Sequence, residues 1–370
     1  MDLADLRADV PALDDDVYCN WGASGPSPRR VVEAMEGTLE YHEYESAGSE
    51  GMYPYAFSVV DDARESVASL LGTDPDAVAL TQSTTDAINR VATAIDWSPG
   101  DEVVVTDLEH SAGRLPWRRL ERDVGIEVTV LETDDGVVDL DEFATAVADA
   151  RLACFSAVDW LYGRRHSVEE MVDVAREADT LTLVDAVQVP GQLPIDVEAW
   201  GADVVAGAGH KWLLGPWGAG FLYVRPTLID RFHPAAVGYR SVEDPNDADI
   251  DYAKGSRRFE IGTTSPAPYA GLVAAIETVR SVGMDAVTSR IRALTARFKD
   301  GIDDDRLLSP RAFHSGLVSV RAEDPAATVD TLAESGVQIR ALPRDETVRV
   351  SLHAINTPED VEAVLAGLQS

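Results

Sequence analysis

The chain has 370 residues, 45% of them hydrophobic, which is enough for one large domain with a substantial core and a second, smaller domain. Its formal charge of −34 is spread along the whole length, so nucleic acid and anionic membrane are poor partners for its surface. No apolar run approaches the roughly 18 residues of a membrane span, and the acidic start, MDLADLRADVPALDDD, does not resemble a signal peptide. We therefore expect a cytoplasmic protein.

Short apolar, β-branched runs alternate with helical patterns over the first two thirds of the chain. Seven runs predict buried strands, at Ala77 to Leu80, Glu102 to Thr106, Ile126 to Leu131, Leu152 to Val158, Leu181 to Val184, Val204 to Ala206 and Gly220 to Val224. Helical patterns include Ala56 to Leu71, Thr85 to Ile95, Val168 to Ala178 and Ala267 to Val282. Such alternation predicts an α/β fold, in which helices cover both faces of a mostly parallel, seven-stranded sheet.

After about residue 280 the pattern changes. A long helical segment is followed by three short strands, with a helix between the first two, and by a final helix from Pro358. The expected elements are the helix Ala286 to Phe298, the strands Gly316 to Arg321, Val337 to Ala341 and Thr347 to Ser351, and the helix Ala326 to Glu334. We therefore predict a large domain of residues 15–280 and a small α+β domain of residues 281–370, which residues 1–14 join.

Lysine is scarce in this sequence. Of the 31 basic residues only three are lysines, namely Lys211, Lys254 and Lys299. Arginine in place of lysine, together with the acidic load, is typical of a halophilic organism, where cations screen the self-repulsion; an ordinary acidic protein is the alternative. Because arginine cannot act as a nucleophilic amine, Lys211, in the segment GAGHKWLLGPWGAG, is the first candidate for chemistry. We expect the other two lysines to be solvated.

The two cysteines, Cys19 and Cys154, lie far apart in the sequence. Their spacing fits neither a disulfide framework nor a set of metal ligands. We expect both to be small buried hydrophobic residues, and we expect no metal site.

Ligands of open α/β sheets bind at the carboxyl ends of the strands, so the residues that follow each strand matter most. After the first strand, residues 81–86 (TQSTTD) run directly into a helix. Backbone N–H groups and hydroxyls at a helix N-terminus suit a phosphate monoester, although the same residues could form a plain N-cap. His110 follows the strand that ends at Thr106. Its imidazole could lie on an aromatic ring or be an ordinary surface residue.

Two further candidates follow later strands. Asp185 ends the strand that begins at Leu181, and Gln188 lies one short turn later. A carboxylate at this position can keep a pyridine nitrogen positive, as pyridoxal phosphate (PLP) requires, or can be a plain polar cap. Lys211 follows the strand at Val204 in a glycine-rich turn, where desolvation would lower the pKa of its amine. A PLP site is indicated when the hydroxyl groups of residues 81–86 are taken together with His110, Asp185 and Lys211.

These residues resemble the class V aminotransferase family, in particular its cysteine desulfurase, selenocysteine lyase and isopenicillin N epimerase-like group. The resemblance runs from about Asn20 to the final helix. The segments that carry it most clearly are 183–188 (LVDAVQ), 194–197 (PIDV), 209–211 (GHK) and 215–220 (GPWGAG). It implies the fold-type I architecture of PLP-dependent transferases and PLP as the cofactor.

The resemblance also implies a role for each candidate. Lys211 would hold PLP as a Schiff base and move protons, Asp185 would pair with the pyridine nitrogen, and His110 would stack on the ring. The implied cofactor-binding residues are Thr84, Thr85, His110, Asp185, Gln188, His210, Lys211 and Thr263. Gln188 would lie near the phenolic oxygen, and Thr84, Thr85 and His210 near the phosphate.

Other implied roles concern the partner subunit and the substrate. The segment 258–263 (RFEIGT) is similar to one whose threonine, here Thr263, reaches the phosphate of the partner subunit's cofactor. This implies a homodimer with shared active sites. Arg349 matches the arginine that grips the carboxylate of a small amino-acid substrate, a task that suits a guanidinium. Asn20 resembles a residue of the substrate-side loop.

Three positions depart from the family pattern. Ala208 stands where many relatives carry a serine before Gly-His-Lys. The segment 156–160 (SAVDW) lacks the asparagine that desulfurases place near the ring. The loop 340–346 (RALPRDE) is short and lacks the catalytic cysteine that desulfurases carry there.

We therefore expect a PLP-dependent aminotransferase, or a cysteine desulfurase-like C–S lyase that lacks the usual cysteine, acting on a small amino acid. An epimerase or racemase remains open, as does a PLP-fold binding protein without turnover. A nucleotide-binding enzyme is disfavoured, because no GxxxxGK[ST] motif is present and no GxGxxG motif joins a first strand to a helix.

Overall fold

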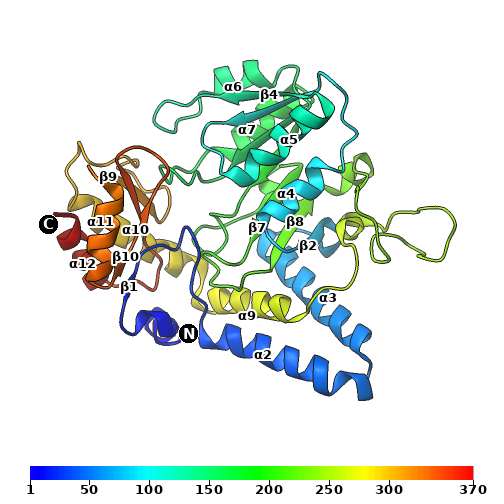
Figure 1. Ribbon diagram of the computed structural model, residues 1–370, viewed down its shortest axis with the longest axis horizontal. Helices are drawn as coiled ribbons and strands as arrows, with labels where there is room; N and C mark the ends of the chain where they lie inside the picture. Colours follow the sequence, from blue (N-terminus) through cyan, green and yellow to red (C-terminus); the bar gives the residue numbers. More distant parts are fainter. Residues whose placement is uncertain (370) are drawn as a thin grey trace.

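The structure is a computed structural model that describes residues 1–369. Its centre is a seven-stranded sheet with the strand order β2-β8-β7-β6-β5-β3-β4 (Figure 1). The strands are β2 (Val78–Thr81), β3 (Glu102–Thr106), β4 (Glu127–Leu131), β5 (Leu152–Ser156), β6 (Leu181–Asp185), β7 (Val204–Ala208) and β8 (Gly220–Val224). β8 is antiparallel to both neighbours, and the other neighbouring pairs are parallel. The predicted mostly parallel sheet is confirmed.

Two layers of helices cover this sheet, and each layer packs on its own hydrophobic cluster. One layer contains α3 (Met52–Leu71), α6 (Leu140–Val147), α7 (Val168–Glu177) and α9 (Ala267–Val282). The other contains α4 (Thr84–Ala92) and α5 (Leu115–Val124). Because both faces are covered, the inner strands carry apolar side chains in a continuous run and not in alternation. Helices on both faces of the sheet confirm the α/β prediction.

Local signals fix the ends of several helices. The Ser83 hydroxyl accepts a hydrogen bond from Asp86 N at 3.1 Å and caps α4. α3 ends at Gly72 and α5 at Gly125, both with a positive φ that favours glycine. Since α4 begins directly after β2, its first turn lies at the carboxyl edge of the sheet.

Two segments extend the large unit to one side. α2 (Arg29–Tyr44) packs along α9 and continues past it towards the end of α3 (Figure 1). Between β8 and α9 the chain forms a long connection that contains two short 3₁₀ helices, Pro226–Arg231 and Gly255–Phe259. This connection carries Thr263 and ends at α9.

The last part of the chain forms the predicted α+β unit. Its antiparallel sheet has the order β11-β12-β9, and three helices pack on it around one hydrophobic cluster. The elements are α10 (Met284–Asp300), β9 (Leu317–Arg321), α11 (Pro325–Glu334), β11 (Arg340–Ala341), β12 (Thr347–Ser351) and α12 (Pro358–Gln369). The N-terminal helix α1 (Leu3–Ala8) is tied to this unit by Arg7, whose Nη1 lies 2.9 Å from Asp360 Oδ2. The division near residue 281 stays a prediction.

The strand predicted at Val337 to Ala341 is not one strand. It consists of β10 (Val337–Gln338), which pairs in parallel with β1 (Val17–Tyr18), and of β11, which pairs with β12. The chain changes partner at Ile339. A sequence pattern cannot show this change, because it depends on where the N-terminal segment lies.

The expectation that Lys299 is solvated was wrong. Its side chain is 3% exposed, and its Nζ donates hydrogen bonds to Pro310 O at 2.7 Å and Ala312 O at 2.9 Å. Burial lowers the pKa of this amine to about 8. Lys299 therefore binds backbone carbonyls of a loop. The sequence pattern does not predict that this loop lies beside Lys299.

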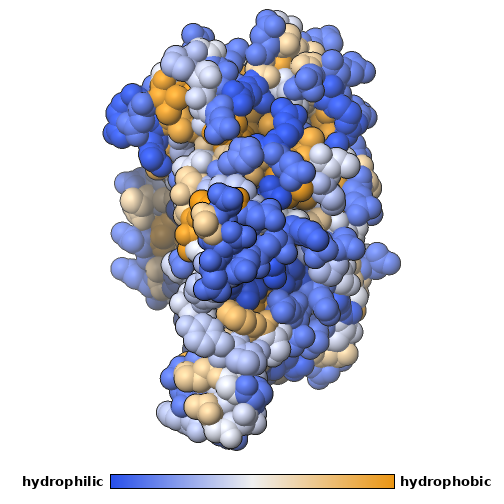
Figure 2. Space-filling model, turned by 90° about the vertical axis from the view of Figure 1, so that its right-hand side faces the viewer, coloured by the Kyte–Doolittle hydropathy of each residue, from blue (hydrophilic) through white to orange (hydrophobic). Residues whose placement is uncertain are grey.

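Hydrophilic residues dominate the face shown in Figure 2, and hydrophobic residues lie between them in small groups. This agrees with the 65 acidic residues of the chain, which are spread over its length. Within residues 1–369, no helix has both the length and the hydropathy needed to cross a bilayer.

Candidate active site

A cavity of about 150 Å³ lies at the carboxyl edge of the central sheet. The predicted site residues that line it are Thr84, Thr85, His110, Asp185, Gln188, His210, Lys211 and Arg349. They come from the ends of β2, β3, β6 and β7 and from β12 of the small unit. The fold therefore brings together residues from five separate segments of the chain. Thr263 lines a different and larger cavity, of about 710 Å³, beside α2 and α3.

Lys211 lies in the turn that follows β7. Gly25 N donates a hydrogen bond to His210 O at 2.7 Å, and a side chain at Gly25 would collide with the Lys211 carbonyl. Burial lowers the pKa of Lys211 to about 7; Asp185 opposes this shift, and two nearby arginines add to it. A large fraction of the amine is therefore neutral near pH 7 and can act as a nucleophile.

Asp185 is the last residue of β6 and is buried at the same cavity. Its Oδ1 accepts a hydrogen bond from Val187 N at 2.9 Å. Burial raises the pKa of Asp185, while this hydrogen bond and the charge of Lys211 lower it. A carboxylate fixed in this way can pair with a cationic ring nitrogen.

Glu109 is a second buried carboxyl, which the sequence analysis did not single out. It accepts hydrogen bonds from Thr106 Oγ1 at 2.9 Å, Ser156 N at 3.0 Å and Ser156 Oγ at 2.7 Å. Burial raises its pKa to about 8, and the charge of Asp185 also raises it. Glu109 is therefore mostly protonated at neutral pH. Its position in the short segment after a buried strand, directly before His110, is the signal that could have identified it.

His110 meets the cavity through an imidazole that is neutral at pH 7. Burial lowers its pKa to about 4, and the charges of Lys211 and three arginines lower it further. Its Nδ1 accepts a hydrogen bond from Ala112 N at 3.3 Å, which places the proton on Nε2. The ring makes an edge-to-face contact with Trp160, with centroids 5.2 Å apart. Trp160 also lines the cavity and was missed, although it lies in the segment noted for its lack of asparagine.

The first turn of α4 forms another part of the cavity wall. Thr84 Oγ1 is buried there, and among residues 1–369 it has no hydrogen-bond partner. Free N–H groups and hydroxyls at a helix N-terminus bind phosphate well. His210 lies at the same cavity, and its ring contacts Trp217 at a centroid distance of 5.8 Å. Burial lowers the pKa of His210 to about 4.

Arg349 is 1% exposed and projects from β12 to the cavity. Its Nη1 donates to Trp160 O at 2.9 Å, whereas its Nε and Nη2 find no partner in the described part of the chain. Burial lowers the pKa of Arg349 to about 9, and the charge of Arg340 lowers it further. Arg340 pairs with Arg349 across β11 and β12 and lines the same cavity. The sequence did not reveal Arg340, because the direction of its side chain depends on the two-residue strand β11.

Gln188 lines the cavity, whereas Asn20, a predicted substrate-binding residue, is not among the residues that line it. The backbone of Asn20 forms an isolated parallel β-bridge with Ser351. Within residues 1–369, neither Asn20 Oδ1 nor Ser351 Oγ has a hydrogen-bond partner. The Gln188 amide is held at both ends, because its Nε2 donates to Gly22 O at 3.0 Å and its Oε1 accepts from Trp212 Nε1 at 2.8 Å. Gln188 therefore orders the wall of the cavity.

This set of side chains fits PLP with a bound amino acid. Buried polar atoms normally have partners, so unsatisfied groups around one cavity indicate a missing ligand. Within residues 1–369, the hydroxyl of Thr84 at a helix N-terminus and two guanidinium nitrogens of Arg349 have no partner, and the low-pKa amine of Lys211 lines the same cavity. A phosphate, a carboxylate and an aldehyde carbon are the groups that these three would bind.

The model of the family described as aminotransferase class-V matches residues 17–364. The chain belongs to the aminotransferase class-V family. This confirms the predicted family, its fold-type I architecture, and PLP as the cofactor of an enzyme. The roles of the individual residues stay predictions. One curated class V relative, from Pyrococcus abyssi, carries the name "Probable cysteine desulfurase"; it is 31% identical, over 99% of this chain and 96% of its own.

Two solved proteins of this kind have the same fold. The apo cysteine desulfurase from Thermococcus onnurineus has a TM-score of 0.91 at 28% identity and covers 98% of this chain and 96% of its own. The cystine C–S lyase C-DES, solved with its product cysteine persulfide, has a TM-score of 0.91 at 26% identity, over 97% of this chain and 98% of its own. A mutant of C-DES was solved with glycine linked to its PLP cofactor.

Neither cysteine of this class V enzyme is among the residues that line the cavity, within residues 1–369. Cys19 and Cys154 are both fully buried and free, as predicted, and burial raises the pKa of both thiols. In the loop 340–346, Arg344 bonds the Tyr162 hydroxyl and stacks on its ring at 4.6 Å. This loop contains no cysteine, and Arg344 fixes it on the aromatic ring of Tyr162.

Proposed function

We propose that this class V enzyme binds PLP through Lys211 and cleaves the carbon–sulfur bond of cysteine, cystine or a related small amino acid. The observation that carries the proposal is the Lys211 amine, with a pKa of about 7, in one cavity with Asp185 and Arg349. The names of the relatives, among them a cysteine desulfurase and a cystine C–S lyase, support the substrate class.

Three side chains would carry the chemistry. When bound, PLP supplies an electron sink for the negative charge that develops on the substrate's α-carbon. The neutral amine of Lys211 removes the α-proton and returns protons where they are needed. Asp185 keeps the ring nitrogen protonated, because its buried charge favours a cationic partner. The neutral His110 covers one face of the ring.

Other side chains would bind and orient. Thr84, Thr85 and His210 hold the phosphate at the start of α4, where N–H groups are free. Arg349 and Asn20 hold the substrate carboxylate, and the two unpartnered nitrogens of Arg349 can both donate to it.

The sulfur would leave without passing through a protein persulfide. Elimination from cysteine with one water gives pyruvate, ammonia and sulfide, and the same cleavage of cystine gives cysteine persulfide in place of sulfide. Neither reaction needs an enzyme thiol. The anchored loop around Arg344 and the burial of Cys19 and Cys154 support this course over sulfur transfer.

The enzyme would act as a homodimer. Large apolar side chains are exposed on α2, α3 and the connection before α9, and four of them line one cavity together with Thr263; they are Leu39, Tyr53, Tyr239 and Ile261. Exposed apolar side chains grouped in this way are typical of an interface. A second copy would cover them, and Thr263, which lies among them, would reach the cofactor of that copy.

The test is product analysis in high salt with cysteine and with cystine. Pyruvate and sulfide, or pyruvate and persulfide, in equal amounts would support the lyase, and the Cys19→Ala, Cys154→Ala double variant should retain the rate. Alanine as the product would instead indicate a desulfurase. A keto acid that keeps its sulfur, with one turnover per site unless an amino acceptor is added, would indicate an aminotransferase.

A further inference from the structure

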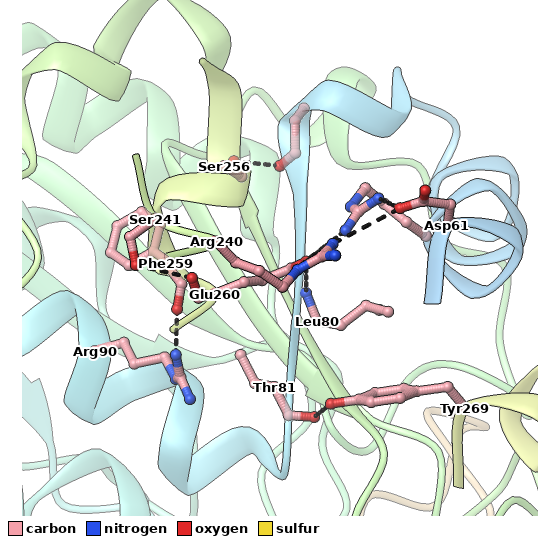
Figure 3. A network of polar contacts seen from close by, with 12 residues as sticks. Asp61, Leu80, Thr81, Arg90, Arg240, Ser241, Ser256, Phe259, Glu260 and Tyr269 are labelled. Atoms are coloured by element: carbon pink, nitrogen blue, oxygen red, sulfur yellow. Dashed lines mark hydrogen bonds and ion pairs between the residues drawn. The ribbon is translucent and has the colours of Figure 1, made fainter. Parts of the chain in front are cut away.

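Glu260 lies directly before the loop 261–265, which contains Thr263, and it is only 7% exposed. Its carboxylate lies between two guanidinium groups (Figure 3). Arg64 Nη2, from α3, donates to both carboxylate oxygens at 2.8 and 2.9 Å. Arg240 donates to Oε2 from Nε at 3.3 Å and from Nη2 at 3.1 Å. Every part of this carboxylate therefore has a partner.

The same segment is bound to the β2–α4 unit. Leu80 N, in β2, donates to Glu260 Oε1 at 3.1 Å. Arg90, in α4, bonds the Phe259 carbonyl, and its Nε donates to Asp86 Oδ1 at 2.9 Å. Asp86 in turn accepts from Gln82 N at 2.9 Å. The segment before the loop is thus attached to the helix whose first turn forms the phosphate end of the Lys211 cavity.

The loop itself has fewer contacts, among them a hydrogen bond from Arg240 N to Ile261 O at 3.3 Å. Residues 261–265 have no regular secondary structure, and most of them are exposed. Their fixed ends are Glu260 on one side and Pro266, which caps the buried start of α9, on the other. The position of Thr263 therefore depends on where Glu260 is held.

We propose that Glu260 is a positioning residue for the active site of the partner subunit: its ion pairs with Arg64 and Arg240 hold the loop that presents Thr263 to the partner's cofactor. This inference rests on the proposed homodimer with shared sites. Glu260→Gln keeps the shape of the side chain but turns one acceptor into a donor that faces a guanidinium, so the loop loses the side-chain part of its anchor, while the bonds to the carbonyls of Phe259 and Glu260 remain.

Hybrid dimers test this directly. One subunit carries Glu260→Gln with Lys211 intact, and the other carries Lys211→Ala with Glu260 intact; two affinity tags isolate the hybrid. In this hybrid, only the subunit with Glu260→Gln has Lys211 in its active site. That site receives its loop from the other subunit, in which Glu260 is intact. We expect this site to retain PLP and turn over as in wild type, whereas the Glu260→Gln homodimer binds PLP about tenfold more weakly or worse.

Hydrogen exchange in the apoprotein gives a second readout. Peptides that cover 261–265 should exchange faster in the Glu260→Gln homodimer. The matched control is Asp61→Asn, because Asp61 also contacts Arg64 at 2.6 Å but is 57% exposed and lies on α3, outside the loop. This control should change neither exchange nor PLP binding.

Three results would overturn the inference. They are wild-type PLP binding in the Glu260→Gln homodimer, a hybrid as defective as that homodimer, and unchanged exchange of the loop. If Glu260→Gln subunits fail to assemble, Arg240→Lys, which keeps the charge but loses the two-bond contact, takes its place in the same hybrid. A Lys211→Ala homodimer that remains active would contradict the proposed function, and the exchange result would still decide the role of Glu260.

Discussion

The Lys211 cavity and the Glu260 cluster are two buried polar sites of opposite character. Around Glu260, two arginines and a backbone N–H saturate one carboxylate. Around Lys211, the cationic groups Arg340 and Arg349 lie beside the amine, and within residues 1–369 two nitrogens of Arg349 stay without a partner. The first arrangement stabilises the protein, and the second is prepared for a ligand that brings its own negative charges.

The pKa values follow the same division. Burial lowers the pKa of Lys211 to about 7 and of Arg349 to about 9, because no carboxylate compensates fully for their desolvation. The pKa of Arg64 is raised, since Glu260 and Asp61 outweigh its burial. The buried cations of the Lys211 cavity thus have lowered pKa values, whereas the pKa of the arginine paired with Glu260 is raised.

Lys211→Ala should have the largest effect on activity. The change removes both the covalent attachment of the cofactor and the base that moves the α-proton, so we expect turnover to fall about 10⁴-fold. The free energy of unfolding should not fall, because an uncompensated buried amine is removed. The measurement is pyruvate release with added PLP, with the Lys254→Ala variant, which changes an exposed lysine, as the control.

Arg64→Gln should have the largest effect on stability. It leaves Glu260 buried with one guanidinium fewer, and breaking a buried ion pair typically costs about 3 to 5 kcal/mol. Urea unfolding at a fixed protein concentration measures this loss. Asp61→Asn, at the exposed end of the same cluster, should cost at most about 1 kcal/mol. Equal losses in the two variants would contradict the structural role of the cluster.

The raised pKa of Glu109 predicts that the free energy of unfolding depends on pH. Its pKa is raised to about 8, above the value of an unfolded chain, so the native state binds this proton more tightly. The free energy of unfolding should therefore fall as the pH rises from about 5 to 8, by an amount on the order of 3 kcal/mol from this group. Glu109→Gln should remove that part of the slope. An unchanged slope would mean that Glu109 is ionised in the native state.

Arg349→Gln should weaken substrate binding without lowering the stability of the protein. Loss of a charge-assisted hydrogen bond to the substrate carboxylate should lower kcat/KM about tenfold to a hundredfold, mostly through KM. Because Arg349 has unsatisfied buried nitrogens, its removal should leave the thermal midpoint unchanged or slightly higher. A large loss of stability would show that Arg349 supports the small unit more than it serves a ligand.

The sequence was sufficient for the sheet and for most of the cavity. The strands are buried runs with clear ends; Asp185 ends one of them and Lys211 lies in the turn after another, where α/β folds bind ligands. Arg340 and Trp160 were missed, since their directions depend on a two-residue strand and on an irregular segment. The burial of Lys299 depends on contacts with a remote loop, which no local pattern records.

The most direct test of the account is to find where the cofactor is attached. The purified protein is reduced with borohydride in high salt, digested, and analysed by mass spectrometry for a pyridoxyl group. The account predicts that the group lies on the peptide that contains Lys211, and that the Lys211→Ala variant carries no such adduct. A pyridoxyl group on Lys254 or Lys299, or no adduct in the wild type after PLP is added, would contradict it.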